Sequence, residues 1–282
     1  MPDESFRDQV VIVTGASAGI GRALALQLAG QGARVAVAAR RADRLEQVAA
    51  EGRQRGGTLL VVPTDVADET QCQALIDKTV GAFGRLDMLI NNAGLAATAL
   101  LEQFPNLGLF RQVMDVNFHG AVACTYYALP HLKRTRGRVV AISSVGGKAA
   151  LPYNTPYISS KFALQGFCDS LRMELQPHGV SVTVICPWWV VTEFHEAQLD
   201  QAGRPRGPRG RAFYTPNMMT AERCAALTLE AAWRRRREVV LGPGWLAAWL
   251  KLLAPGLLDW VTVKVFLEPV IRRARAQGRT TE

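Results

Sequence analysis

Seven short apolar runs divide the chain at regular intervals, near residues 9–13, 33–39, 58–63, 87–91, 138–143, 180–186 and 238–241. Stretches with helical periodicity separate these runs. This alternation predicts an α/β fold, a doubly wound parallel sheet of about seven strands with helices on both faces. Right-handed crossovers would bring the carboxyl ends of the strands to one edge, where such sheets bind ligands.

Composition agrees with a single folded unit. The chain has 282 residues, of which 49% are hydrophobic and 20% charged, so it can bury a large core. We expect one domain over residues 1–243 and, as part of the same domain, a Trp/Leu-rich helical extension over residues 244–282.

A glycine-rich turn follows the first apolar run. Gly15, Gly19 and Gly21 lie between that run and a helical stretch that starts near Ala23. Glycines at such a turn let the backbone approach a ligand, and the N-terminus of a helix attracts phosphate. The alternative is a tight connection with no ligand.

Tyr157 and Lys161 are four positions apart and would share one helix face. An ammonium near a phenol favours the phenolate, so we expect Lys161 to lower the pKa of Tyr157 and prepare it for acid/base chemistry. Such a pair also arises by chance on a solvated helix face, so the rest of the chain must support this interpretation.

Three further motifs occur in order with these two. They are Asn-Asn-Ala-Gly at residues 91–94, Asn117 within Asp-Val-Asn-Phe, and Ser144 thirteen residues before Tyr157. Together the five motifs resemble those of the short-chain dehydrogenase/reductase family, of the ordinary single-domain type. The resemblance covers residues 7 to about 243.

The resemblance implies roles for individual residues. Ser144 would bind the substrate oxygen, Tyr157 would exchange its proton, and Lys161 would also hold the ribose of the nicotinamide nucleotide. Asn117 would kink its helix and hold a water leading to Lys161. The implied cofactor-binding residues are Gly15, Ser17, Gly19, Ile20, Gly21, Arg40, Arg41, Asp65, Val66, Asn92, Ala93, Gly94, Tyr157, Lys161, Pro187, Val190 and Thr192. This chemistry requires no metal.

The end of the second apolar run indicates which cofactor is bound. Position 39 is alanine rather than an acid, and Arg40 and Arg41 follow. In this fold an acid there suits the ribose hydroxyl of NAD, whereas an arginine suits the 2′-phosphate of NADP, so NADP(H) is favoured. Solvated arginines at a helix start are the alternative. By the resemblance Asp65 would bind the adenine amino group; otherwise it caps a turn.

The pattern departs from the family at Trp188, where relatives usually have glycine. Either the backbone there avoids positive φ, or the ring points into the substrate cavity, which we favour. Trp188 and Trp189 could equally pack in the core.

Charge is concentrated late in the chain. Residues 1–203 hold 18 basic and 18 acidic side chains, so the net charge of +9 comes from the remainder. By the resemblance, residues 193–218 would be a substrate lid. The arginines of this lid would face an anionic substrate or simply solvent. A second run of arginines, later in the chain, would complement the dipole of the helix before it. The absence of interleaved aromatic residues argues against nucleic acid. The lid arginines are Arg204, Arg206, Arg209 and Arg211, and the second run is Arg234 to Arg237.

The extension beyond Gly244 is rich in Trp and Leu but has no apolar run long enough to cross a membrane. Residues 245–271 fit a peripheral membrane contact, a flap over the site or a subunit interface. Any of these favours a hydrophobic substrate such as a steroid, retinoid or lipid. Residues 160–174 are also similar to hydroxysteroid-dehydrogenase-like members of the family.

Two other functions remain open: reduction of ketoacyl groups bound to CoA or to a carrier, and a non-catalytic NADP-binding module. The chain has no Gly-x-Ser-x-Gly motif, and its four histidines lack the spacing of metal ligands. The sequence therefore favours neither a hydrolase nor a metal enzyme. We interpret the five cysteines as reduced core residues. We also find no apolar signal segment before the first strand, so we expect a cytoplasmic protein. By the resemblance it would be a homodimer or homotetramer through the helices of Asn117 and Tyr157.

Overall fold

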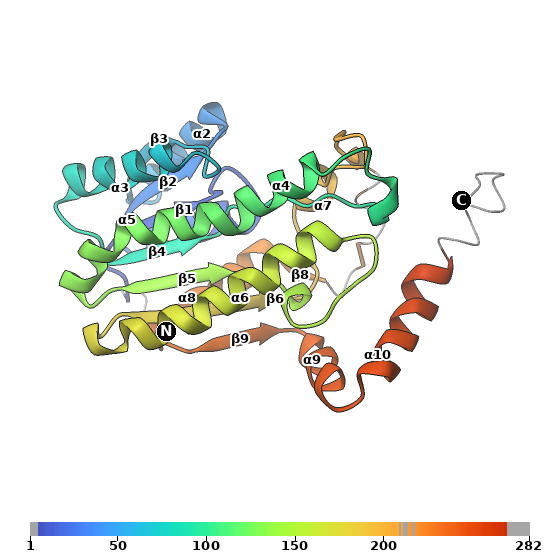
Figure 1. Cartoon of the computed structure of the whole chain (residues 1–282). Coiled ribbons are helices and arrows are strands. Elements are labelled where there is room, and N and C mark those ends of the chain that lie inside the picture. The colour runs from blue at the N-terminus through green and yellow to red at the C-terminus, as the bar shows by residue number, and fades with distance from the viewer. Residues whose placement is uncertain (1–4, 209, 211–213, 216–217, 270–282) are drawn as a thin grey trace.

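The computed structural model describes residues 5–208, 210, 214–215 and 218–269. Its centre is a parallel sheet of seven strands in the order β3-β2-β1-β4-β5-β6-β9 (Figure 1). The predicted fold class is therefore confirmed, and each strand lies within one or two residues of its apolar run. The strands are β1 (Val10–Thr14), β2 (Arg34–Ala39), β3 (Thr58–Pro63), β4 (Met88–Asn91), β5 (Arg138–Ile142), β6 (Ser181–Pro187) and β9 (Glu238–Leu241).

Helices cover both faces of the sheet because alternate strand residues point to opposite sides. Val11 and Val13 face one hydrophobic cluster, and Val10 and Ile12 face the other. The first cluster includes α1 (Gly19–Gly30), α2 (Ala42–Gln54) and α8 (Ala221–Trp233). The second includes α3 (Glu69–Phe83), α5 (Gly120–Thr135) and α6 (Thr155–Leu175), and α4 (Gly108–Met114) packs on α6. All five cysteines are buried and free, as predicted.

The carboxyl ends of the strands point toward the side where α7 (Phe194–Ala197), α9 (Gly244–Leu253) and α10 (Pro255–Thr262) lie (Figure 1). The strand order reverses beside β1, which creates the crevice where ligands bind in such sheets. A small separate sheet pairs β7 (Val190–Val191) with β8 (Met219–Thr220). The sequence did not predict this pair, because two-residue strands carry no periodic pattern.

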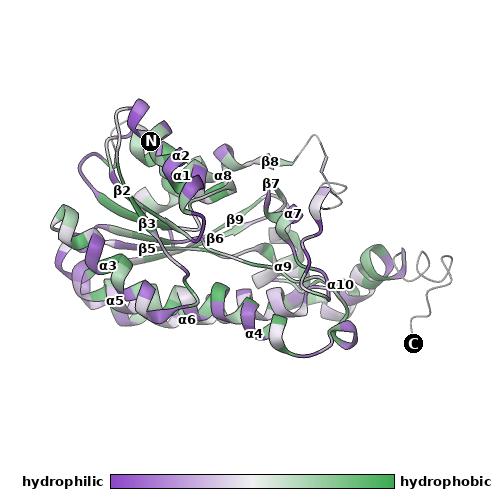
Figure 2. Cartoon of the chain, turned by 90° about the horizontal axis from the view of Figure 1, so that it is seen from above, coloured by the Kyte–Doolittle hydropathy of each residue, from purple (hydrophilic) through white to green (hydrophobic). Residues whose placement is uncertain are grey.

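The extension is helical, as predicted: it forms α9 and α10, followed by a π-helical turn at Val263–Leu267. Figures 1 and 2 place both helices on the same side of the molecule as α7. Their outer face exposes several large apolar side chains, namely Trp245, Trp249, Leu252, Leu253, Leu257 and Trp260. Within the described part of the chain, no helix has the length and apolar character needed to cross a membrane.

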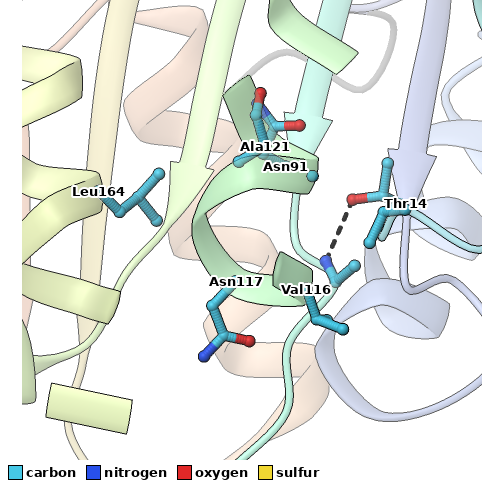
Figure 3. Close-up of a pocket in the computed structure, with 9 residues that line it drawn as sticks. Thr14, Asn91, Val116, Asn117, Ala121 and Leu164 are labelled. Atoms are coloured by element: carbon cyan, nitrogen blue, oxygen red, sulfur yellow. Dashed lines mark hydrogen bonds between the residues drawn. The ribbon is translucent and has the colours of Figure 1, made fainter. Parts of the chain in front are cut away.

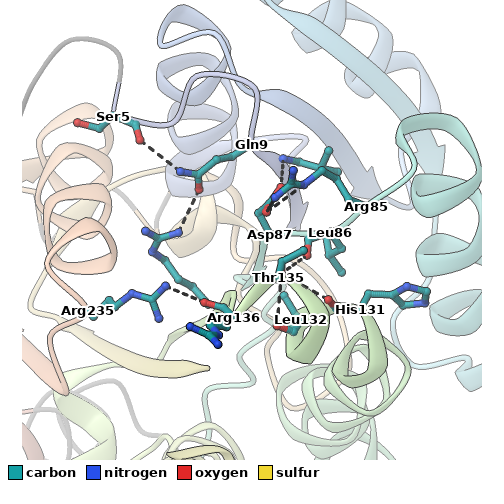
Figure 4. Close-up of polar contacts among 12 residues, drawn as sticks. Ser5, Gln9, Arg85, Leu86, Asp87, His131, Leu132, Thr135, Arg136 and Arg235 are labelled. Carbon is teal, nitrogen blue, oxygen red and sulfur yellow. Dashed lines mark hydrogen bonds and ion pairs between the residues drawn. The ribbon is translucent and has the colours of Figure 1, made fainter. Parts of the chain in front are cut away.

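The opposite edge of the sheet is closed by polar contacts (Figure 4). Asp87, only 5% exposed, accepts hydrogen bonds from the Val10 backbone N–H at 2.9 Å and from Arg85. Arg235 donates to the carbonyls of Arg136 and Gly179 at 2.7 and 2.9 Å. The arginine run was expected to complement the dipole of the helix that precedes it. For Arg235 this expectation was wrong, because its guanidinium donates to carbonyls at the ends of other helical segments.

Candidate active site

The glycine-rich turn is shaped for close approach of a ligand. Gly15 and Gly19 have φ of 66° and 53°, which favour glycine. A Cβ added to Gly21 would lie 2.3 Å from the Gly15 carbonyl oxygen, so a larger residue would displace the turn. Ala18 caps α1 without a side-chain hydrogen bond, which leaves first-turn N–H groups for an anion. This cradle fits a dinucleotide phosphate.

The loop after β4 holds this turn in place. Asn92 donates its side-chain N–H to the Thr14 carbonyl at 2.9 Å. The Thr14 hydroxyl in turn accepts the backbone N–H groups of Asn92 and Ala93, at 3.0 and 3.1 Å; Figure 3 shows Thr14 with a dashed hydrogen bond to its hydroxyl. The Asn-Asn-Ala-Gly motif therefore braces the cradle from the neighbouring strand.

A cavity of about 1300 Å³ runs along this edge of the sheet. It joins the cradle to α6 and to the inner side of α9 and α10. Of the residues implied by the family resemblance, Gly21 and Asn117 are not among those that line it. The others line it: Gly15, Ser17, Gly19, Ile20, Arg40, Arg41, Asp65, Val66, Asn92, Ala93, Gly94, Ser144, Tyr157, Lys161, Pro187, Val190 and Thr192.

Tyr157 and Lys161 lie one turn apart on α6 and face the cavity. The Lys161 Nζ lies 5.6 Å from the centroid of the Tyr157 ring and donates to the Ile142 carbonyl at 2.9 Å. Ser144, which follows β5, hydrogen-bonds with Tyr157. The strand end thus places a hydroxyl beside the phenol, and α6 places the ammonium beneath it.

The expected lowering of the pKa of Tyr157 by Lys161 was wrong. Burial raises the pKa of Tyr157 to about 12, and the hydrogen bond with Ser144 offsets only part of this. Burial also lowers the pKa of Lys161 to about 8. Removal of water from both groups outweighs the attraction between a phenolate and an ammonium. The Lys161 ammonium donates its hydrogen bond to a backbone carbonyl instead.

Asn117 lies in a π-helical turn, Asp115–His119, between α4 and α5. This turn is the irregularity expected from the resemblance. Asn117 bonds the backbone N–H and carbonyl of Leu95, at 2.7 and 2.9 Å, and the Ser160 hydroxyl at 2.9 Å. Beside it a cavity of about 10 Å³, with Thr14 and Asn91 in its wall, is large enough for one water (Figure 3).

Three arginines gather at the far end of the cavity. Arg41 donates to the Ser17 hydroxyl at 2.9 Å, and Arg40 lies 3.9 Å from Asp65. One oxygen of Asp65 accepts the Ala67 N–H at 3.1 Å, so the predicted turn cap is present while the residue also lines the cavity. Arg44 was not among the cofactor-binding residues expected from the sequence. Its position one helical turn after Arg41 was the signal that could have indicated it.

The two tryptophans belong to the cavity rather than the core. Both line it, Trp188 is 37% exposed, and neither has a positive φ. The absence of a positive φ agrees with the first explanation given for Trp188, and its place in the cavity lining agrees with the second.

The described lid arginines bond within their own segment. Arg204 pairs with Asp200 at 3.0 Å, and Arg206 donates to Gln198 at 3.3 Å. Neither contact directs the arginine toward a substrate. Arg209 and Arg211 lie outside the described residues, as do residues 270–282. Among the described residues, no group of three or more His, Cys, Asp or Glu is placed to hold a metal ion.

Comparison with known proteins agrees with this geometry. Residues 9–203 match the family model of the short chain dehydrogenases. The chain is 34% identical over 280 residues to the 11-beta-hydroxysteroid dehydrogenase-like 2 of Arabidopsis thaliana, covering 96% of this chain and 86% of the relative. It is 34% identical over 270 residues to the 11-beta-hydroxysteroid dehydrogenase A of Sesamum indicum, covering 94% and 77%.

Two solved structures share the fold. A short chain dehydrogenase/reductase from Burkholderia phymatum in complex with NAD superposes with a TM-score of 0.79 at 27% identity, over 90% of this chain and 96% of that one. An alcohol dehydrogenase from Thermococcus sibiricus complexed with 5-hydroxy-NADP has a TM-score of 0.71 at 28% identity, over 83% and 96%. The chain therefore belongs to the short-chain dehydrogenase family of oxidoreductases.

Proposed function

We propose that this protein is an NADP(H)-dependent oxidoreductase that interconverts a carbonyl and a secondary alcohol. The observation that carries the proposal is the placement of Ser144, Tyr157 and Lys161 in the same cavity as the phosphate cradle. The nicotinamide, when bound, supplies or accepts the hydride. Tyr157 gives the proton to the substrate oxygen, Ser144 holds that oxygen, and Lys161 binds the ribose and keeps positive charge near the phenol.

The choice of NADP(H) rests on the arginines beside the cradle. Position 39 has no acid to bind a ribose hydroxyl, and Arg40 and Arg41 line the cavity there. Arg44 adds a third cation. Of the two solved relatives, one is described with NAD and the other with an NADP derivative, so the preference is argued from this chain's own residues.

The substrate is proposed to be hydrophobic, of the steroid, retinoid or lipid kind. The inner side of the extension brings apolar residues to the cavity, namely Leu246, Leu250, Leu258, Val261 and Phe266. Relatives named as hydroxysteroid dehydrogenases point the same way. This shared wall also supports a single domain, with residues 1–243 as the catalytic part and residues 244–282 as its extension. A CoA- or carrier-bound ketoacyl substrate is the weaker candidate, because the wall that the extension adds to the cavity is apolar.

The test is NADPH oxidation across ketones of graded size and polarity, with NADH in parallel. We expect turnover with hydrophobic ketones and a preference for NADPH. Turnover of small polar ketones alone would contradict the hydrophobic substrate, and absence of turnover across the panel would favour a non-catalytic module. Activity on ketoacyl thioesters that falls steeply with salt would favour the CoA- or carrier-bound alternative.

We also propose that the outer face of α9 and α10 rests on a membrane surface. Trp245, Trp249 and Trp260 are 56–60% exposed there, and tryptophan side chains favour the membrane interface. Binding to lipid vesicles should fall when these three residues are changed to serine, whereas Leu107→Ser, which removes an exposed apolar side chain just before α4, should leave it unchanged. Equal vesicle binding by all three proteins would contradict the contact.

Assembly and compartment are proposed on separate grounds. Tyr126 on α5 and Met173 on α6 are 66% and 68% exposed, which suits a homodimer or homotetramer through those helices. The five free cysteines suit the reducing cytoplasm.

A further inference from the structure

Glu193, the first residue of the lid, bonds to Arg44 of α2 and lies near Arg41, which precedes this helix. Its two carboxylate oxygens accept hydrogen bonds from Arg44 at 2.9 and 2.7 Å. One of them also lies 3.9 Å from Arg41, whose guanidinium donates to Ser17 in the glycine-rich turn. The lid, the glycine-rich turn and the start of α2 therefore meet around one carboxylate.

These contacts lie in the basic cluster to which the proposed function assigns the 2′-phosphate. Arg41, Arg44, Ser17 and Glu193 all line the large cavity. The side chains of Arg41, Arg44 and Glu193 are 47%, 40% and 53% exposed, so an ion from solvent can reach them. An exposed ion pair of this kind is weak, and a phosphate dianion attracts guanidinium groups more strongly than a carboxylate does.

We propose that Glu193 is a specificity-determining residue whose carboxylate competes with the cofactor 2′-phosphate for Arg41 and Arg44. Because the carboxylate and the phosphate repel each other, filling the phosphate site releases the lid from α2. The proposal rests on NADP(H) being the cofactor. It means that the 2′-phosphate, which takes no part in the chemistry, controls when the lid moves.

The first experiment compares cofactor affinities of the wild type and Glu193→Gln, by titration of NADPH and NADH. We expect NADPH to bind about three- to fivefold more tightly to the variant, the size expected from loss of an exposed ion pair, and NADH to bind equally to both. Glu196→Gln, which removes the same charge three residues later, should change NADPH affinity less. Equal effects of the two variants would mean that Glu193 acts only as one of several negative charges that repel the phosphate, and this would overturn the proposal. Weaker NADPH binding by Glu193→Gln would overturn it as well.

The second experiment follows the lid itself by hydrogen exchange of the backbone amides of residues 194–200. In the wild type, 2′,5′-ADP should speed exchange there and 5′-AMP should not, since only the former carries the competing phosphate. Glu193→Gln should exchange fast without any ligand. Exchange unaffected by 2′,5′-ADP would overturn the proposal.

The two failures are distinguishable. If the wild type binds NADH as well as NADPH, the proposed cofactor is wrong. If the wild type prefers NADPH and Glu193→Gln keeps the same ratio of affinities, the cofactor stands and the competition is wrong.

Discussion

The two edges of the sheet both carry arginines, but their guanidinium groups have different surroundings. At the amino edge Arg138 lies within 6 Å of the Phe6 and Trp233 ring centroids and donates to the Ala232 carbonyl at 3.1 Å. Arg235 is held by backbone carbonyls. At the carboxyl edge Arg40 and Arg41 are 64% and 47% exposed, and their nearest carboxylates lie 3.9 Å away.

This difference separates stability from ligand binding. Cations whose donors are satisfied by the protein hold helices and strands together, and a ligand cannot reach them. Cations with exposed donors near a glycine-rich turn add little to stability and are ready for an anion. Substitutions among the polar contacts of the amino edge should therefore change unfolding and leave cofactor affinity intact, whereas substitution of Arg40 or Arg41 should weaken cofactor binding and leave unfolding nearly unchanged.

The largest expected effect is at the carboxyl edge. Tyr157→Phe removes the proposed proton donor, so kcat should fall by about 10²- to 10⁴-fold while the Kd for NADPH stays unchanged. Tyr153→Phe, four residues earlier, is the matched control and should keep its activity. Steady-state rates and cofactor titration test both. Substantial turnover by Tyr157→Phe would mean that another group supplies the proton.

The next effect is at the amino edge. Asp87→Ala leaves the buried Val10 N–H without its acceptor and should lower the free energy of unfolding by about 1–3 kcal/mol. Asp87→Asn keeps an acceptor and should lose less. Denaturant unfolding measures both, and NADPH should bind each folded variant as it binds the wild type. A change in NADPH affinity would contradict the separation of the two edges.

A smaller effect follows from the buried ammonium of Lys161. Its pKa is lowered from 10.5 to about 8 in the folded protein, so between about pH 8 and 10 the unfolded chain holds a proton that the folded chain has lost. The free energy of unfolding should therefore rise with pH in this window, by on the order of 1–2 kcal/mol between pH 8 and 9.5. The raised pKa of Tyr157 acts in the opposite direction only above about pH 10.

Lys161→Met should lack this rise, because it has no proton to lose. The measurement is the difference in unfolding free energy between wild type and variant at several pH values, which cancels groups common to both. A difference independent of pH would show that Lys161 titrates near its ordinary pKa.

Local patterns in the sequence were enough to predict the sheet and most of the cavity lining. An apolar run marks each of the seven strands of the sheet, and parallel pairing then brings the strand ends together, which is why Gly15, Asn92 and Ser144 line one cavity. The pKa values could not be predicted in this way, since they depend on how much water the folded chain removes. The contact of Glu193 with Arg44 spans 149 residues, and no local pattern signals it.

The short pairing of β7 with β8 has a consequence for how this enzyme could diversify. Val190 and Val191 are held beside Met219 and Thr220, so the chain leaves the sheet region and returns to it at two paired strands that form a neck. Insertions, deletions or a transplanted segment beyond that neck would leave the strand register undisturbed. Exchanging residues 194–218 between relatives, with Thr192 and Glu193 kept at the cofactor site, is thus a practical route to new substrate preferences.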